Sequence, residues 1–208
     1  MNLTPDFLRD EILKMAALVE TVLNKSAKKD VTLSEIFELE NEINKFHSHL
    51  DDECFKYIAL MKPSAKDLRT AICTMKMCAE LERIADQAVK IKRSFRKLSK
   101  HYPILDLMIE DVERMVKNSI NSFVQGDIKL ATDVLQHDQV VNELNKNIIQ
   151  NSANEIKNNT LDFDEGIHVM HLARNYERIG DLATNIAEDL IFLESGQDVR
   201  HQVPKQER

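Results

Sequence analysis

The sequence contains few of the residues that interrupt helices. Its 208 residues include four glycines, four prolines and no tryptophan. With so few glycines the chain has no glycine-rich phosphate-binding loop, and no segment has the pattern of a strand. Charged residues make up 30% of the chain, and Leu, Ile, Lys, Glu, Asp and Asn dominate. The composition therefore predicts an all-α protein.

Cysteines, long apolar runs and excess positive charge are also scarce. Cys54, Cys73 and Cys78 are odd in number and form no CxxC, which predicts reduced and mostly buried thiols. No run of about 18 apolar residues predicts a membrane span, and the N-terminus lacks a signal-peptide pattern. We therefore expect a cytoplasmic location. The net charge of −7 argues against broad contact with nucleic acid.

A short motif occurs twice in the chain. ERIAD at 82–86 recurs as ERIGD at 177–181, displaced by 95 positions. Such a repeat indicates one structural unit used twice. Each copy places two carboxylates four residues apart, so that on a helix they share a face and repel each other. Their retention in both copies suggests a bound cation. The register continues through flanking apolar residues: Ile72, Met75, Ala88 and Ile91 correspond to Ile167, Met170, Ala183 and Ile186.

Apolar spacing and turn residues predict six helices, three in each half. The expected starts are Thr4, Thr32 or Ser34, Ser64, about Ile104, Asp127, and Thr160 or Asp162. Short loops predict antiparallel neighbours, so each half should form a three-helix bundle. We expect one repeat over 1–100, a second over 101–196 and a polar tail over 197–208.

Each half also offers an acid and an amide on a second helix, opposite the repeated acidic pair. Glu40 and Asn44 precede one motif, and Asp138 and Asn142 precede the other, at matching positions of their apolar stripes. Oxygen-rich sites for hard cations need ligands from more than one element. We therefore expect a divalent or trivalent ion (Mg²⁺, Mn²⁺, Fe or Zn²⁺) in each half, with His47 biasing the first site toward a transition metal. The expected ligands are Glu40, Asn44, Glu82 and Asp86 in the first half, and Asp138, Asn142, Glu177 and Asp181 in the second.

Simpler interpretations remain open. Arg83 with Asp86, and Arg178 with Asp181, are spaced for solvated i,i+3 ion pairs. Glu165 and His168 have the spacing of a ferritin-like di-iron ligand pair, but the first half has Thr70 and Cys73 at those positions. No Ser-His-Asp or Cys-His arrangement stands out, so we expect no catalytic residues and no enzyme.

Three segments resemble the PhoU family, the accessory and regulatory proteins of phosphate-specific transport. These are KPSAKDLR at 62–69, ELERIADQAV at 80–89 and ARNYERIGDLATNIAE at 173–188. The resemblance implies two repeated three-helix bundles with metal clusters at Glu82 and Asp86 and at Glu177 and Asp181. The family often has Asp where this chain has Asn44 and Asn142. Each site therefore carries less charge, which predicts weaker binding or fewer ions.

The resemblance also implies a function. It predicts a negative regulator of phosphate uptake and of the phosphate-starvation response, which couples a phosphate ABC transporter to a sensor histidine kinase. The implied partners are the transporter's ATPase subunit, the kinase and a second copy of the chain in a homodimer, without membrane insertion. The alternatives are a helical metal-binding protein or metalloenzyme that uses the acidic sites, and a plain helical adaptor.

Overall fold

The computed structural model describes residues 3–195, and the expected tail at 197–208 lies outside them. Within that range the chain is helical and contains no strand, which confirms the all-α prediction. No helix within residues 3–195 combines the length and the apolar character needed to span a bilayer. The helices are α1 (Pro5–Ser26), α2 (Leu33–Met61), α3 (Ala65–Phe95), α4 (Pro103–Gln125), α5 (Ile128–Lys157) and α6 (Phe163–Ser195).

Side-chain caps start four of the helices where the sequence predicts a start. Thr4 accepts a hydrogen bond from the Phe7 amide at 3.1 Å, and Asp127 accepts one from the Leu130 amide at 3.0 Å. Thr32 forms a full capping box with Glu35 before α2. Asp162 accepts the Glu165 amide at 3.1 Å before α6. Each cap satisfies a backbone donor that the first turn leaves without a partner.

Turns with left-handed backbone end two helices. Gly126 follows α4 with φ 67°, a conformation that costs glycine little because it has no Cβ. Lys62 follows α2 with φ 47°. Ser64 occupies the N-cap position of α3, but its hydroxyl donates to Asp67 at 3.0 Å instead of accepting a backbone amide. Ser64 therefore stands at the predicted capping position but does not form the capping hydrogen bond.

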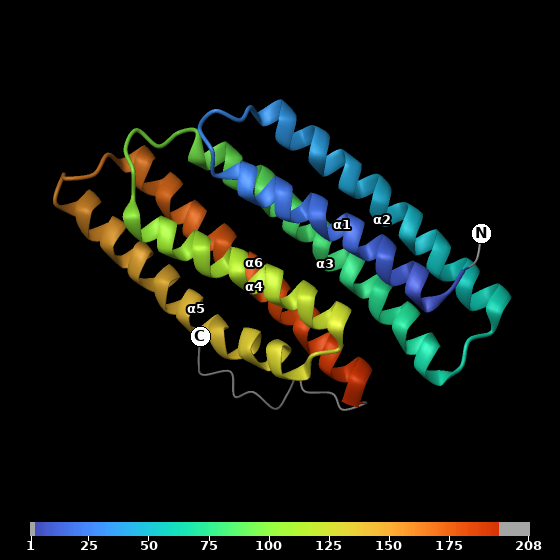
Figure 1. The fold of residues 1–208 in the computed structure, drawn as a ribbon. Coiled ribbons are helices and arrows are strands. Elements are labelled where there is room, and N and C mark those ends of the chain that lie inside the picture. Colours follow the sequence, from blue (N-terminus) through green and yellow to red (C-terminus); the bar gives the residue numbers. More distant parts are fainter. Residues whose placement is uncertain (1–2, 196–208) are drawn as a thin grey trace.

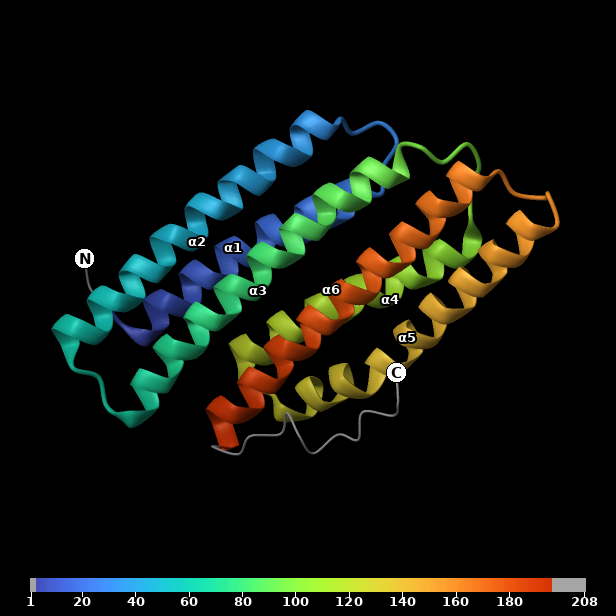
Figure 2. The same cartoon turned by 180° about the vertical axis from the view of Figure 1, so that it is seen from behind.

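The six helices form two three-helix bundles lying side by side (Figures 1 and 2). α1, α2 and α3 make the first bundle, and α4, α5 and α6 make the second. α3 packs against α6, and α1 packs against α4, so these four helices form the boundary between the bundles. α2 and α5 lie at opposite outer edges (Figure 2). The repeated acidic motifs on α3 and α6 are therefore carried by the two central helices.

One apolar core extends through both bundles. The apolar residues that continue the repeated motif toward the C-terminal ends of α3 and α6 are fully buried, as expected: Ala88, Ile91, Ala183 and Ile186. Leu81, Ile84 and Ile179 lie in the same buried stripes. Burying such a side chain stabilises the fold by roughly 1.5–3 kcal/mol. The same cluster includes residues of all six helices. Cys54, Cys73 and Cys78 are free and buried, as expected.

The segment that joins the bundles is tied to α6. Both the backbone amide and the hydroxyl of Ser99 donate to the Glu165 carboxylate, at 2.9 and 2.7 Å. Glu165, the candidate ferritin-like ligand, therefore holds the α3–α4 connection. Its carboxylate accepts hydrogen bonds from Ser99, which gives it a structural role.

Candidate functional site

The first acidic motif lies on the side of α3 that faces α2. Glu82 and Asp86 are half-buried there. Burial raises the pKa of Glu82 above its ordinary value, and the Asp86 carboxylate raises it further. Glu40 of α2 acts in the same direction, whereas the imidazole of His47 lowers this pKa. The structure therefore brings together residues that the sequence predicts on two helices.

The second motif is arranged in the same way on α6, facing α5. Burial raises the pKa of Asp138 on α5, and the Asp181 carboxylate of α6 raises it further. Gly180 lies at the same contact, since a Cβ built there would be 3.5 Å from Asp138 Oδ1. Glu177, one turn before Asp181, is half-buried. Each half thus places carboxylates of two facing helices close together.

The two predicted amides make equivalent contacts in the two halves. Asn44 Nδ2 donates to Glu40 Oε1 at 2.6 Å, and Asn142 Nδ2 donates to Asp138 Oδ2 at 2.7 Å. Both bonds join residues i and i+4 along one helix. They fix which edge of each amide faces its acid, and the bond from Asn142 lowers the pKa of Asp138.

Two buried acceptor atoms in these sites receive no hydrogen bond from the described part of the chain. They are Asn44 Oδ1 in the first half and Asp138 Oδ1 in the second. A buried acceptor without a donor costs about 1–3 kcal/mol. A cation in each half would give the buried oxygen of that half a partner. It would also offset the repulsion between the carboxylates of that half. The donor types, amide and carboxylate oxygen with one imidazole in the first half, fit such an ion.

The eight predicted ligands nevertheless do not form closed coordination shells in the described residues. Among residues 3–195, no three His, Cys, Asp or Glu side chains converge closely enough to hold a metal ion. The ligand set predicted from the sequence therefore shares a face and a helix boundary in each half. Whether these eight residues bind a metal stays a prediction.

Arg83, which the sequence spacing pairs with Asp86, has a different partner in the structure. Arg83 Nη1 lies 3.2 Å from Glu80 Oε1, so Arg83 pairs with the residue three positions before it and not with Asp86. The simple interpretation of Arg83–Asp86 as a solvated surface pair is therefore wrong. Asp86 stays on the face of α3 that carries Glu82.

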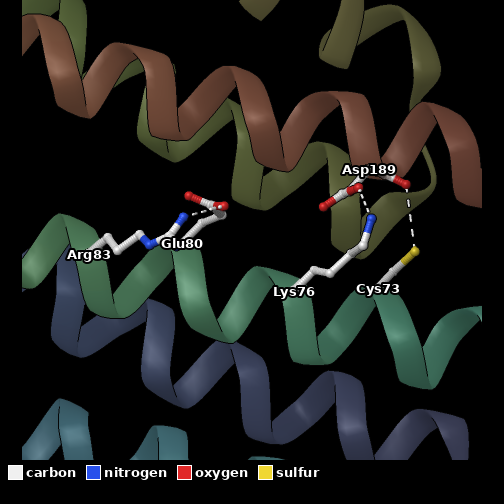
Figure 3. A network of polar contacts seen from close by, with 5 residues as sticks. All are labelled: Cys73, Lys76, Glu80, Arg83 and Asp189. Carbon is white, nitrogen blue, oxygen red and sulfur yellow. Dashed lines mark hydrogen bonds and ion pairs between the residues drawn. The ribbon is translucent and has the colours of Figure 1, made fainter. Parts of the chain in front are cut away.

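Sequence reasoning missed a polar cleft of about 330 Å³ between α3 and α6. Figure 3 shows its ion pair between the bundles, in which Lys76 Nζ lies 2.7 Å from Asp189 Oδ1. Cys73 Sγ also donates to the Asp189 carbonyl at 3.7 Å. No periodicity relates these residues, because they come from non-equivalent positions of the two repeats. The other lining residues are Ala79, Glu80, Arg83, Asn185 and Glu188.

A family model described as the PhoU domain matches residues 10–94 and, a second time, residues 105–190. The chain belongs to the PhoU family. Its PhoU relatives include the phosphate-specific transport system accessory protein PhoU homologs of Pseudomonas aeruginosa and Aquifex aeolicus. They are 30% and 31% identical to it; the alignments cover 93% of this chain in both cases, and 85% and 92% of the respective relatives.

Solved PhoU structures share the fold. The crystal structure of PhoU from Pseudomonas aeruginosa matches with a TM-score of 0.86 and 29% identity, over 92% of this chain and 97% of that one. The phosphate transport system regulatory protein PhoU from Streptococcus pneumoniae also gives 0.86, at 22% identity, over 94% of this chain and 97% of that one. The second match bears on the fold alone. Together they confirm the PhoU architecture of two repeated three-helix bundles.

Proposed function

We propose that this protein is a negative regulator of phosphate uptake and of the phosphate-starvation response. In this proposal it couples a phosphate ABC transporter to a sensor histidine kinase. The observation that carries the proposal is the match of the PhoU family model to both halves of the chain. The names of its relatives, as accessory proteins of phosphate-specific transport, point to the same system.

The proposed mechanism is contact and not catalysis. The protein binds the ATPase subunit of the transporter and the cytoplasmic part of the kinase when phosphate is ample. Both contacts require a cytoplasmic location. A pair of rigid helical bundles suits an adaptor, because it can present two surfaces at a fixed separation. A homodimer would present each of these surfaces twice. The metalloenzyme alternative is not favoured, since the relatives bear the names of accessory proteins.

The repeated acidic sites are proposed to hold divalent or trivalent metal ions. Glu40, Asn44, Glu82 and Asp86 would bind one, and Asp138, Asn142, Glu177 and Asp181 the other. The ion would supply positive charge between two helices that carry facing carboxylates. It would thereby hold α2 against α3 and α5 against α6. The two buried oxygens that lack donors, Asn44 Oδ1 and Asp138 Oδ1, support this assignment.

A phosphate-starvation reporter in phosphate-rich medium tests the regulatory role. Deletion of the gene should derepress the reporter, and the wild-type gene should restore silence. The same deletion in a strain without the kinase should change nothing, because the kinase is the proposed route. A reporter that stays silent on deletion would contradict the regulatory role. A response that persists without the kinase would contradict the proposed route.

The contribution of the metal sites is tested in the same strain. Complementation with E82Q/D86N or E177Q/D181N should leave the reporter partly derepressed. The matched control is Asp52→Asn, which removes one carboxylate from an exposed position of α2 with 64% side-chain exposure. Full silencing by both double variants would show that regulation does not need these carboxylates.

A further inference from the structure

Four exposed cations lie at one end of the boundary between α3 and α6. They are Lys90 and Arg93 of α3 and Arg174 and Arg178 of α6, and together they are called the basic patch. The chain that carries them has a net charge of −7. The basic patch is therefore a local excess of positive charge on an acidic protein.

The packing of the two helices brings the patch together. α3 and α6 run antiparallel (Figure 2), so each step forward along α3 is a step back along α6. Two contacts fix their register, one near each end of the boundary: Lys76 with Asp189, and Ser99 with Glu165. Between these contacts Lys90 lies level with Arg174. The cations of the two helices therefore belong to one surface.

This surface is open to solvent. α1 and α4 pack behind α3 and α6, and α2 and α5 lie at the two outer edges (Figures 1 and 2). No other helix within residues 3–195 therefore lies over the α3–α6 face. The polar cleft of about 330 Å³ lies toward the other end of the boundary, and none of the four cations lines it. An open surface suits a macromolecular partner, whereas small ligands are usually held in a concave site.

The positive charges of the patch are not neutralised within the described part of the chain. No ion pair among residues 3–195 involves any of the four cations. Arg93 lies over the ring of Phe37, 5.5 Å from its centroid, a contact that keeps the charge of the guanidinium. Asp86 and Asp181 are about one turn away along their helices, but they belong to the acidic sites beside α2 and α5.

Helix electrostatics accounts for only one of the four cations. The dipole of a helix favours positive charge in its last turn, which is where Arg93 lies in α3. Lys90 lies before that turn, and Arg174 and Arg178 lie within the middle part of α6. Arg174 and Arg178 are also four residues apart, a spacing at which like charges on a helix repel. A negatively charged partner would relieve this repulsion.

Duplication of the repeat does not account for the patch either. At a displacement of 95 positions, its four members correspond to residues that line the polar cleft: Asn185, Glu188, Ala79 and Arg83. Only one of these is a cation, and Arg83 is paired with Glu80 at 3.2 Å. The unpaired positive charge is therefore particular to one end of the boundary.

We propose that the basic patch is a docking surface for an acidic surface of a partner protein. The proposal rests on the proposed function and adds to it the place of contact, since the ATPase subunit and the kinase are the candidate partners. Guanidinium groups bind carboxylates through paired hydrogen bonds. Complementary charge also speeds association and orients the partner. A nucleic acid fits less well, because the acidic remainder of the chain would repel its phosphates.

Binding of the full-length protein to the purified ATPase subunit and to the cytoplasmic part of the kinase tests the proposal. Arg174→Glu/Arg178→Glu should weaken binding to one of them by about 10-fold or more, mainly through slower association. The difference from wild type should shrink at high salt, which screens the attraction. Lys90→Glu, on the other helix, should act in the same direction. Arg174→Lys/Arg178→Lys keeps the charge and should keep most of the affinity.

The matched control is Lys117→Glu/Lys146→Glu, which makes the same change in net charge at exposed positions of α4 and α5. It should change the affinity by less than about 3-fold, because isolated surface charges contribute little. An equal loss in the control and in Arg174→Glu/Arg178→Glu would show that net charge matters and the patch does not. Helical circular dichroism confirms that each variant is folded.

The other outcomes separate the docking surface from the regulatory role. If Arg174→Glu/Arg178→Glu binds both proteins as wild type does, the docking surface is overturned and the regulatory role stands. If wild type binds neither protein, the proposed route falls and the docking surface falls with it. Phosphatidylglycerol vesicles and single-stranded RNA are the comparison polyanions. Loss of binding to either of these, with protein binding unchanged, would assign the patch to a membrane or a nucleic acid and overturn the proposal.

Discussion

Lys76 of α3 and Asp189 of α6 form an ion pair across the boundary between the two bundles (Figure 3). Their Nζ and Oδ1 atoms are 2.7 Å apart, with 40% and 14% of the respective side chains exposed. The residues that correspond to them in the repeat are His171 and Ser94, which cannot form the same pair. The cleft between α3 and α6 is therefore one place where the two repeats are no longer equivalent.

A double-mutant cycle with Lys76→Gln and Asp189→Asn should give a coupling free energy of about 0.5–1 kcal/mol, because the pair is partly exposed. The coupling should shrink in 1 M salt, where the screening length is about 3 Å. Urea unfolding at low and high salt measures both. The Lys14–Glu11 pair within α1, at 2.6 Å, is the control and should couple more weakly, because Lys14 is exposed to solvent. Equal coupling in the two pairs would show that the contact between bundles adds nothing.

Replacing two glycines of α6 by alanine, one at a time, should change the stability of the fold in opposite directions. At Gly180 a Cβ meets Asp138 Oδ1 and Val141 Cγ1 at 3.5 Å, which is ordinary contact. Gly180→Ala should therefore stabilise the fold by about 0.5–1 kcal/mol, since glycine inside a helix loses more backbone entropy. At Gly166 a Cβ would lie 2.5 Å from Ile156 Cδ1 and 2.9 Å from its Cγ1.

Gly166→Ala should consequently lower the unfolding midpoint, because Ile156 must move to make room. Thermal and urea unfolding of the two variants against wild type checks both signs. A gain in stability at Gly166, or a loss at Gly180, would contradict the packing described for α6.

The raised pKa of Asp138 makes the stability of the metal-free protein depend on pH. The folded protein holds this proton at pH values where the unfolded chain has released it, above the ordinary pKa of 3.8. Stability therefore falls as pH rises through that window, and the penalty is fully present at pH 7. Asp138→Asn should stabilise the metal-free protein at pH 7 by roughly 0.5–1 kcal/mol after allowing for solvent screening. Below about pH 3.8 the gain should vanish.

Binding of metal should make wild type more stable than Asp138→Asn, which reverses their order in the metal-free state. At a concentration 100 times its Kd, a bound ion stabilises a protein by about 2.7 kcal/mol. Wild type should gain this amount on adding Mn²⁺, and Asp138→Asn should gain markedly less. Melting curves with and without Mn²⁺, each with a chelator control, provide the measurement. An equal gain in both proteins would place the ion elsewhere.

The helices and the acidic faces were predictable because they depend on local rules. Spacing of three and four residues predicts the buried stripe through Leu81 and Ile84, and capping chemistry predicts the starts at Thr4 and Asp127. The pairing of Glu82 with α2 follows from short loops and antiparallel neighbours. Local rules also fail in places, as when Ser64 bonds Asp67 in place of a backbone amide.

The contacts between the repeats could not be predicted in this way. Lys76 and Asp189 lie 113 positions apart, and both would be suitable surface residues of an isolated helix. Their pairing depends on how α3 packs against α6, and that packing is set by the fit of many apolar side chains. The Ser99–Glu165 contact could not be predicted either, because the spacing of Glu165 and His168 points to a metal-ligand pair and not to a contact with the α3–α4 connection.

The apolar core that runs through all six helices also bears on how the chain folds. Neither repeat can complete its own interior, because the inner faces of α3 and α6 cover each other. The protein should therefore lose its structure in one cooperative transition, despite its duplicated architecture. A fragment cut at the α3–α4 connection would expose the inner face of α3 and would have to bury it against another copy. The two repeats should therefore depend on each other for stability.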